Sequence, residues 1–99
     1  MDAALIYELS DPSADSRIVV ELIQLGYNTS WRTDQGTVKY TLPKGMLWKV
    51  NITFSDALKD IKTACDRLNT ATVGLNLKIV HCIVLDTANW AGIPDSAQG

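Results

Sequence analysis

The sequence predicts a single α+β domain, and three observations support this class. Two segments, 13–25 and 53–69, carry apolar residues at the three- and four-residue spacings of an amphipathic helix. Segments 3–9, 27–52 and 77–85 are instead rich in residues typical of strands. The chain has 99 residues, 46% of them hydrophobic, which suffices for one modest core without disulfides or metal. We therefore expect one domain over residues 1–94 and a frayed tail over residues 95–99.

The chain opens with an apolar run, Ala3–Leu9, that is interrupted by one acid, Glu8. We expect a buried strand that ends where Asp11 and Pro12 begin a helix. Asp11 suits the N-cap, and Pro12 suits the first helical position, where no backbone donor is needed. Gly26 is a good left-handed terminator for this helix. Two carboxylates, those of Glu8 and Asp11, therefore lie at a strand–helix junction, where small α/β domains often place chemistry.

The segment between the two helices has no helical period, and it is rich in Thr, Val, Tyr and Trp. Turn signals occur at residues 34–36 and 43–45. We predict a hairpin that pairs Thr37–Leu42 with Met46–Asn51. A shorter strand around Asn28–Arg32 precedes this hairpin.

Thr53 or Ser55 is expected to cap the second helix, which runs to about Asn69. Its charged residues alternate in sign on one side, as is typical of a solvated helix face. The residues predicted to form its buried stripe are Ala57, Leu58, Ile61, Ala64, Cys65 and Leu68.

The last predicted strand, Leu77–Leu85, is apolar on both faces apart from Lys78 and His81, so we expect it to be central or covered on both sides. The resulting element order predicts a ferredoxin-like βαββαβ fold, with two helices on one face of an antiparallel sheet. The other face is left open, and the aromatic side chains of the middle segment need cover. Self-association would provide it, so we expect a homodimer.

The two cysteines, Cys65 and Cys82, lack a CxxC spacing and fall within the helical and strand patterns. We expect free, buried thiols, which favours a reducing compartment. No signal peptide is visible, and the longest apolar run, Ile79–Leu85, is too short to span a bilayer. The sequence therefore predicts a cytoplasmic protein with no membrane partner.

Glu8 and Asp11 are the candidate metal ligands. Lying three residues apart across a strand end, they could share a hard cation such as Mg²⁺ through their oxygens. A two-fold axis that brought in the same acids from a second copy would strengthen the site. The alternative is that Asp11 is only a helix cap and Glu8 only a solvent-facing strand residue. His81 is the only histidine, so a zinc site has no support, and a hydrogen-bonded strand histidine is the simpler interpretation.

The formal net charge of −2 argues against strong general affinity for nucleic acid, but the charge is unevenly distributed. Segment 31–52 holds four basic residues against one acid, Asp34. Basic residues interleaved with aromatic ones are typical of a groove that follows phosphates while the rings stack on bases. The alternative is a hairpin whose lysines discourage edge pairing while its aromatic rings pack on the sheet. The candidate residues for binding nucleic acid are Arg32, Lys39, Lys44, Lys49, Trp31 and Trp48.

Several short motifs extend these observations. They are Ile6-Tyr7-Glu8-Leu9, Asp11-Pro12, Leu25-Gly26-Tyr27, Leu47-Trp48-Lys49-Val50 and Asn89-Trp90-Ala91-Gly92. Together the motifs resemble the small dimeric nucleases of CRISPR adaptation, more closely their short SinR-like relatives and distantly the VapD toxins. The resemblance covers most of residues 3–94. Two departures from the family pattern are visible: Glu8 stands where the family usually has Asp, and segment 33–41 looks inserted.

The resemblance implies a ferredoxin-like homodimer with metal-dependent cleavage of RNA or DNA in some members. The family's metal-binding acid falls on Glu8, which becomes the expected catalytic residue. Our first hypothesis is therefore a Mg²⁺-dependent endonuclease acting as a homodimer. The second is a non-catalytic dimer that binds nucleic acid or protein within a toxin–antitoxin or CRISPR-related system. A third, a small regulatory ligand-binding domain, needs a polar pocket at a subunit interface. Fold alone does not choose between them.

Overall fold

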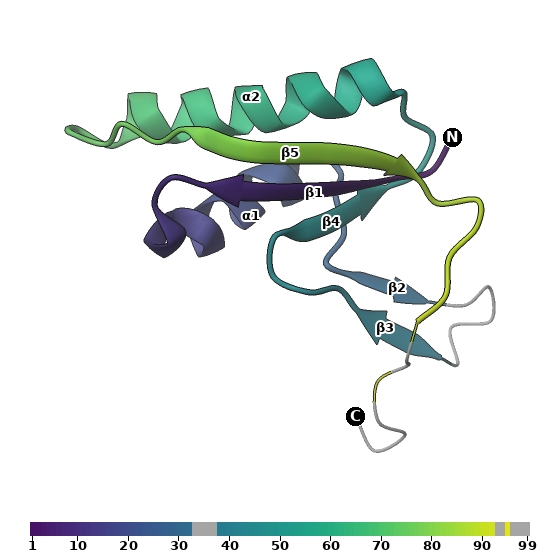
Figure 1. Ribbon diagram of the computed structural model, residues 1–99. Helices are drawn as coiled ribbons and strands as arrows, with labels where there is room; N and C mark the ends of the chain where they lie inside the picture. The colour runs from purple at the N-terminus through teal and green to yellow at the C-terminus, as the bar shows by residue number, and fades with distance from the viewer. Residues whose placement is uncertain (33–37, 93–94, 96–99) are drawn as a thin grey trace.

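The computed structural model describes residues 1–32, 38–92 and 95, and it confirms a small α+β fold. The main sheet has three antiparallel strands. In spatial order they are β4 (Met46–Lys49), β1 (Ala3–Leu9) and β5 (Ile79–Asp86). The strand nearest the N-terminus is thus the centre of the sheet, with the two later strands on either side of it (Figure 1).

β1 alternates strictly between the two faces of the sheet, because successive side chains of a strand point in opposite directions. Leu5, Tyr7 and Leu9 are buried in the core. Leu5 lies opposite Leu47 of β4 and opposite Val84 of β5, so all three strands contribute to the same apolar layer. The residues between them on β1, including Ile6 and Glu8, therefore face the other way.

The first helix begins as the sequence predicts. Asp11 accepts a hydrogen bond from Ser13 N at 3.0 Å, and Pro12 occupies the first position of a short 3₁₀ turn, Pro12–Ala14. α1 (Asp15–Gln24) continues from this turn. Gly26, with φ of 99°, adopts the left-handed conformation expected of a terminator.

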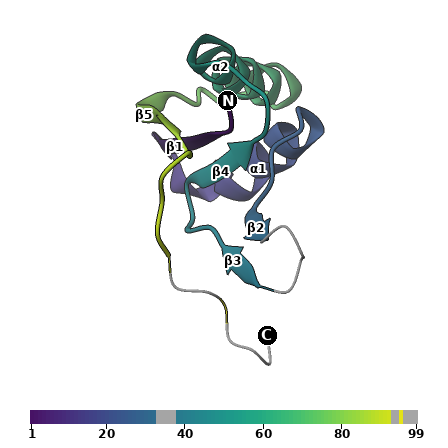
Figure 2. The same cartoon turned by 90° about the vertical axis from the view of Figure 1, so that its right-hand side faces the viewer.

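The second helix, α2 (Phe54–Ala71), is capped by Thr53, whose hydroxyl oxygen accepts from Asp56 N at 3.1 Å. Both helices cover the same face of the sheet, as expected (Figure 2). Ile18 and Leu22 of α1 and Ile61 of α2 are almost completely buried beneath them.

The prediction that Leu58 belongs to the buried stripe of α2 is wrong. Leu58 retains 39% of its exposure, although the rest of the predicted stripe is buried. Successive helical residues are about 100° apart, so the neighbour of the fully buried Ala57 falls at the margin of the stripe rather than within it.

The predicted hairpin between Thr37–Leu42 and Met46–Asn51 is also wrong. β3 (Lys39–Thr41) instead pairs antiparallel with β2 (Ser30–Arg32), forming a separate two-stranded sheet, and β4 pairs with β1. The predicted short strand before the hairpin corresponds to β2 and is confirmed. The predicted turn signal at 34–36 lies outside the described residues.

The turn at 43–45 explains why β3 and β4 do not pair. Met46 N donates to Pro43 O at 3.1 Å, and Gly45, with φ of 83°, takes the positive angle that a type II turn requires at its third position. Tyr7 N then donates to Gly45 O at 2.8 Å, which directs β4 along β1 instead of back along β3.

β5 is an edge strand of the described sheet, which corrects the prediction of a central or doubly covered strand. It also starts later than predicted. The side-chain amide of Asn69 donates to Leu77 O at 2.9 Å and accepts from Leu77 N at 2.7 Å. Because Asn69 occupies both backbone groups of Leu77, that residue cannot join the sheet ladder, although its side chain is buried.

Both cysteines are free, with Cys65 buried and Cys82 half-buried, as predicted. Within the described part of the chain, none of the helices combines the length and the apolar character needed to cross a membrane. The predicted frayed tail lies largely outside the described residues.

Candidate functional site

The face of the main sheet opposite the helices is largely apolar, and it is called the open face below. Ile6 of β1 lies between Met46 of β4 and Ile83 of β5 in the register. Ile83 is 57% exposed, and Leu85 of β5, opposite Ala4, is also about half exposed. Aliphatic side chains in this number on one side of an edge strand are unusual for a surface that only water contacts.

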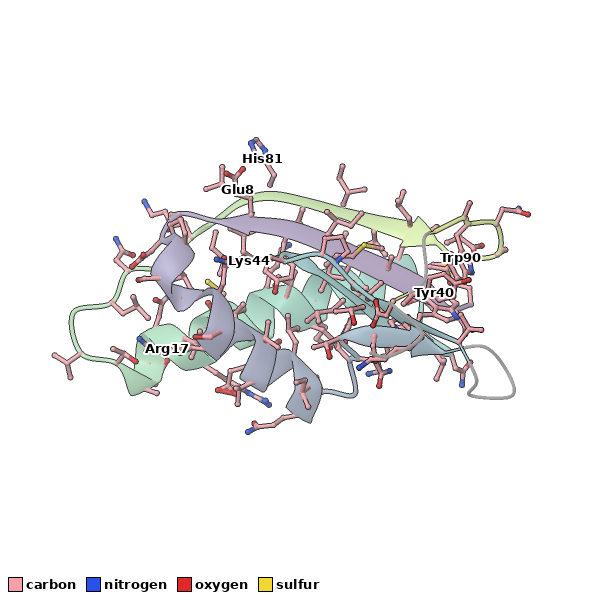
Figure 3. All side chains as sticks on the ribbon, turned by 90° about the horizontal axis from the view of Figure 1, so that it is seen from below. Glu8, Arg17, Tyr40, Lys44, His81 and Trp90 are labelled. Carbon is pink, nitrogen blue, oxygen red and sulfur yellow. The ribbon has the colours of Figure 1, made fainter. Side chains whose placement is uncertain are left out.

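Glu8 and His81 are the polar pair of the open face. They lie opposite each other on β1 and β5, with 3.7 Å between Glu8 Oε1 and His81 Nε2. Figure 3 shows both side chains projecting from the side of the sheet opposite the helices. The pair is well exposed, at 66% for Glu8 and 75% for His81, so it contributes little to stability. Its effect is to place a carboxylate and an imidazole together on an apolar surface.

Asp11, the second predicted metal ligand, is engaged in capping. Its Oδ1 accepts from Ser13 N at 3.0 Å and from Ser13 Oγ at 2.7 Å. These hydrogen bonds hold the pKa of the Asp11 carboxyl below its usual value. Among the residues that the structure describes, no group of three or more His, Cys, Asp or Glu side chains could hold a metal ion. Within the described part of one copy, Glu8 and Asp11 therefore belong to no such group.

The structure places two of the predicted basic residues, Lys44 and Lys49, beside acids. Lys49 is half-buried: its Nζ donates to Leu25 O at 2.6 Å, lies 3.8 Å from Asp60 Oδ2, and stands 5.5 Å above the centre of the Tyr27 ring. This ammonium thus closes the C-terminal end of α1, where a cation is favoured. Lys39 is half-buried on β3, and the side chain of Arg32 lies outside the described part of the structure.

The tyrosine beneath Lys49 completes this junction. The hydroxyl of Tyr27 donates to Asp60 Oδ2 at 3.0 Å. Burial, and then this bond to a carboxylate, raise the pKa of Tyr27. α1, β4 and α2 are therefore tied together by one cation, one phenol and one carboxylate.

The predicted aromatic residues contact one another. Trp31 stacks on Trp48 with ring centres 4.3 Å apart and lies 5.0 Å from Trp90, which meets Tyr40 edge-on at 4.9 Å. Trp48 Nε1 also donates to Ser30 O at 2.6 Å. The cluster joins the β2–β3 hairpin to β4 and to the segment after β5 (Figure 3). A hollow of about 340 Å³ remains beside the rings.

A second cavity, of about 430 Å³, lies between α1 and the loop from β3 to β4. Tyr7, Asp15 and Lys44 are among its polar lining residues. Lys44 Nζ lies 3.3 Å from Asp15 Oδ2, so an ion pair joins the two walls. The Tyr7 hydroxyl is buried without a hydrogen-bond partner among the described residues.

Sequence reasoning missed this cavity. The available signal was Tyr7 itself, because a tyrosine at a core-facing strand position must place its hydroxyl somewhere. Asp15 carried no comparable signal, since an acid in the first turn of a helix is ordinarily explained by the helix dipole.

Comparisons with known protein families, with curated proteins and with solved structures find no match to this chain.

Proposed function

We propose that this protein works as a homodimer joined through the open face of its main sheet. The observation that carries the proposal is the half exposure of Ile83 and Leu85 on a surface that the helices leave uncovered. Burial of such side chains is the main driving force of association. The protein then acts as a self-associating binding module, which corresponds to the second hypothesis from the sequence.

Charge also supports this arrangement. A two-fold axis makes an interface self-complementary, so a residue of one copy contacts a different residue of the other. On the open face, Glu8 of one copy can then meet His81 of its partner, and the apolar side chains can meet one another.

The proposal includes a ferredoxin-like order for the complete fold. The strands β5, β1 and β4 supply three positions of such a sheet. An isolated antiparallel bridge between Asn28 and Trp48 lies beyond β4, where the fourth strand of a βαββαβ sheet belongs. In this interpretation the β2–β3 hairpin is an insertion beside that edge.

Sedimentation of the parent and of Ile83→Asp tests the proposal. The parent is expected to be a dimer at tens of micromolar, because interfaces of ordinary size remain formed well below that concentration. Ile83→Asp should be a folded monomer, since two copies would bury unpaired carboxylates facing each other. Leu58→Asp is the matched control: it places the same charge at a partly exposed apolar site on α2 and should leave the dimer intact. A monomeric parent, or a dimer that survives Ile83→Asp, contradicts the proposal.

A second candidate function is Mg²⁺-dependent cleavage of RNA or DNA by the same dimer. The observation that favours it is the position of Glu8 on the open face, where a two-fold axis can bring its copy nearby. The two Glu8 and two His81 side chains would together supply the ligands that a single chain lacks. Mg²⁺ prefers carboxylate oxygens and water, so the two glutamates would be its protein ligands.

Glu8→Gln tests this second candidate, because the amide keeps the shape of the side chain but removes the charge that holds a divalent cation. Any Mg²⁺- or Mn²⁺-dependent cleavage should be abolished while the dimer persists. The matched control is Asp11→Asn, which changes a nearby carboxylate in the same way and keeps a residue well suited to the N-cap. Cleavage at the parent rate in Glu8→Gln, in protein free of contaminating nuclease, would end this candidate.

A further inference from the structure

The cavity between α1 and the β3–β4 loop is bounded by a largely buried carboxylate on one side and by an exposed lysine on the other. Asp15, in the first turn of α1, keeps only 19% of its side-chain exposure, whereas Lys44, on the loop, keeps 73%. The lysine side chain can therefore swing into solvent at little cost, while the carboxylate stays in place. Figure 3 shows Lys44 beside β1, at the end of the sheet nearer Glu8.

The charge of the cavity excludes a simple anion such as phosphate. An anion placed there would face the half-buried carboxylate of Asp15, and only one exposed lysine would compensate it. A cation is favoured instead, because it can replace the ammonium of Lys44 at the Asp15 carboxylate. The displaced Lys44 ammonium is then free to pair with a negative group on the same ligand.

Tyr7 lines the cavity, but its hydroxyl oxygen is buried and does not open into it. A buried hydroxyl without a partner is costly, and native structures rarely contain one without a reason. Burial, and then the negative charge of Asp15, raise the pKa of Tyr7 to about 12, so the hydroxyl stays protonated at neutral pH. The Tyr7 hydroxyl therefore adds no charge beside the site, and the Asp15–Lys44 pair supplies the polar contacts.

The remaining surface of the cavity is mostly apolar and includes Val19, Leu42, Pro43 and Met46. A small hydrocarbon group fits this surface, and a few polar groups at one end would fix its orientation. We propose that the cavity binds a small zwitterion with an apolar side chain, such as a free aliphatic α-amino acid. Its ammonium meets Asp15, and its carboxylate meets Lys44. This site lies within one chain and does not depend on the proposed dimer.

Titration of the full-length protein with three probes of similar shape tests the site. L-Valine carries both charges, isobutylamine carries only the ammonium, and isobutyrate carries only the carboxylate. L-Valine should bind with a Kd on the order of 0.1–1 mM, as suits a ligand of this size. Isobutylamine should bind about tenfold more weakly, and isobutyrate should not bind. The measurement is the shift of backbone amide signals, with the largest changes expected at Ser16 and Gly45, which line the cavity.

Two variants identify the contacts. Lys44→Met keeps the length of the side chain and removes the ammonium that pairs with the ligand carboxylate, so the protein should fold normally and bind L-valine about tenfold more weakly, whereas isobutylamine should bind at least as well as to the parent. Asp15→Asn should abolish binding of both ammonium probes. Asp11→Asn is again the matched control, because that carboxylate caps the 3₁₀ turn and does not line this cavity, so affinity should be unchanged.

Three results would overturn the proposal. They are the absence of any shift at Ser16 and Gly45 with all three probes, binding of isobutyrate as tight as that of L-valine, and unchanged L-valine affinity in Asp15→Asn. The first would make the cavity a hydration site only.

Discussion

The two faces of the main sheet are built from the same three strands, but only one of them is covered by the helices. On the helix side, Leu5 and Tyr7 of β1 are sealed beneath α1 and α2. On the open face, one residue along the same strand, Glu8 and the opposite His81 are largely exposed, and Ile83 and Leu85 of β5 are about half exposed. The difference teaches that strand alternation sets which residues share a face, whereas the placement of the helices decides which face becomes the core.

The comparison also separates stability from association. Apolar residues on the helix side are buried within one chain, so their loss should unfold the protein. Those on the open face contribute apolar surface that only a partner can bury. Substitutions of similar chemistry on the two sides are therefore expected to have different effects.

Ile18→Asp should have the largest effect, because it places an unpaired charge at a fully buried position between α1 and the sheet. The expected loss is about 3–5 kcal/mol, comparable to the whole stability of a small domain. Leu58→Asp, at a partly exposed position on α2, should cost less than about 1 kcal/mol. Urea unfolding measures both. Equal losses of stability in the two variants would contradict the assignment of Ile18 to the buried stripe and of Leu58 to its partly exposed edge.

High pH should have the next largest effect, because ionisation of a tyrosine buried on the helix side of the sheet lowers the free energy of unfolding. A tyrosine whose folded pKa is raised stabilises the protein fully below its unfolded value of 10.0, and this stabilisation is lost as pH rises through the folded value. For Tyr7 the window extends from pH 10.0 to about 12, and the full loss is about 3 kcal/mol. Tyr27 acts in the same direction.

Urea unfolding at about pH 8 and about pH 11 checks this expectation. The parent should lose more stability between the two values than Tyr7→Phe does. Identical losses in the parent and in the variant would show that the Tyr7 hydroxyl ionises as readily in the folded state as in the unfolded chain.

Trp90→Ala should have a smaller and more local effect. Trp90 contacts Trp31 and Tyr40 but is 46% exposed, and each aromatic contact contributes about 0.5–1.5 kcal/mol. We expect a loss of about 1–2 kcal/mol and faster amide exchange in β2 and β3, with exchange in β1 little changed. Uniform acceleration throughout the chain would show that the hairpin and the main sheet unfold as one unit.

The local features of the fold could be predicted from the sequence, whereas the pairing of its strands could not. The caps at Asp11 and Thr53 and the terminator Gly26 depend on residues within a turn of one another, so their signals are contained in short segments. The pairing of β4 with β1 joins residues forty or more positions apart, and the hydrogen bond from Tyr7 to Gly45 that directs it leaves no local pattern.

The candidate site shows the same limit. The sequence predicts Glu8 as a candidate metal ligand because an acid within an apolar strand is easily recognised. The sequence predicts that Lys49 binds nucleic acid because it stands among aromatic residues, whereas its contacts with Leu25 O and Asp60 form only in the folded chain. The cavity at Tyr7 is likewise created by α1 and a loop that meet only in the folded chain.

Gly45 is a position at which this sequence is expected to tolerate no other residue. A β-carbon added there would lie 2.7 Å from the backbone oxygen of Tyr7, closer than real side chains approach, and the positive φ would strain it further. A library of random variants selected only for folding should therefore keep glycine at this position while neighbouring Lys44 changes freely. A distant homologue with the same architecture is expected to carry a glycine directly before its β4. This glycine would help to recognise such a homologue when its overall sequence similarity is low.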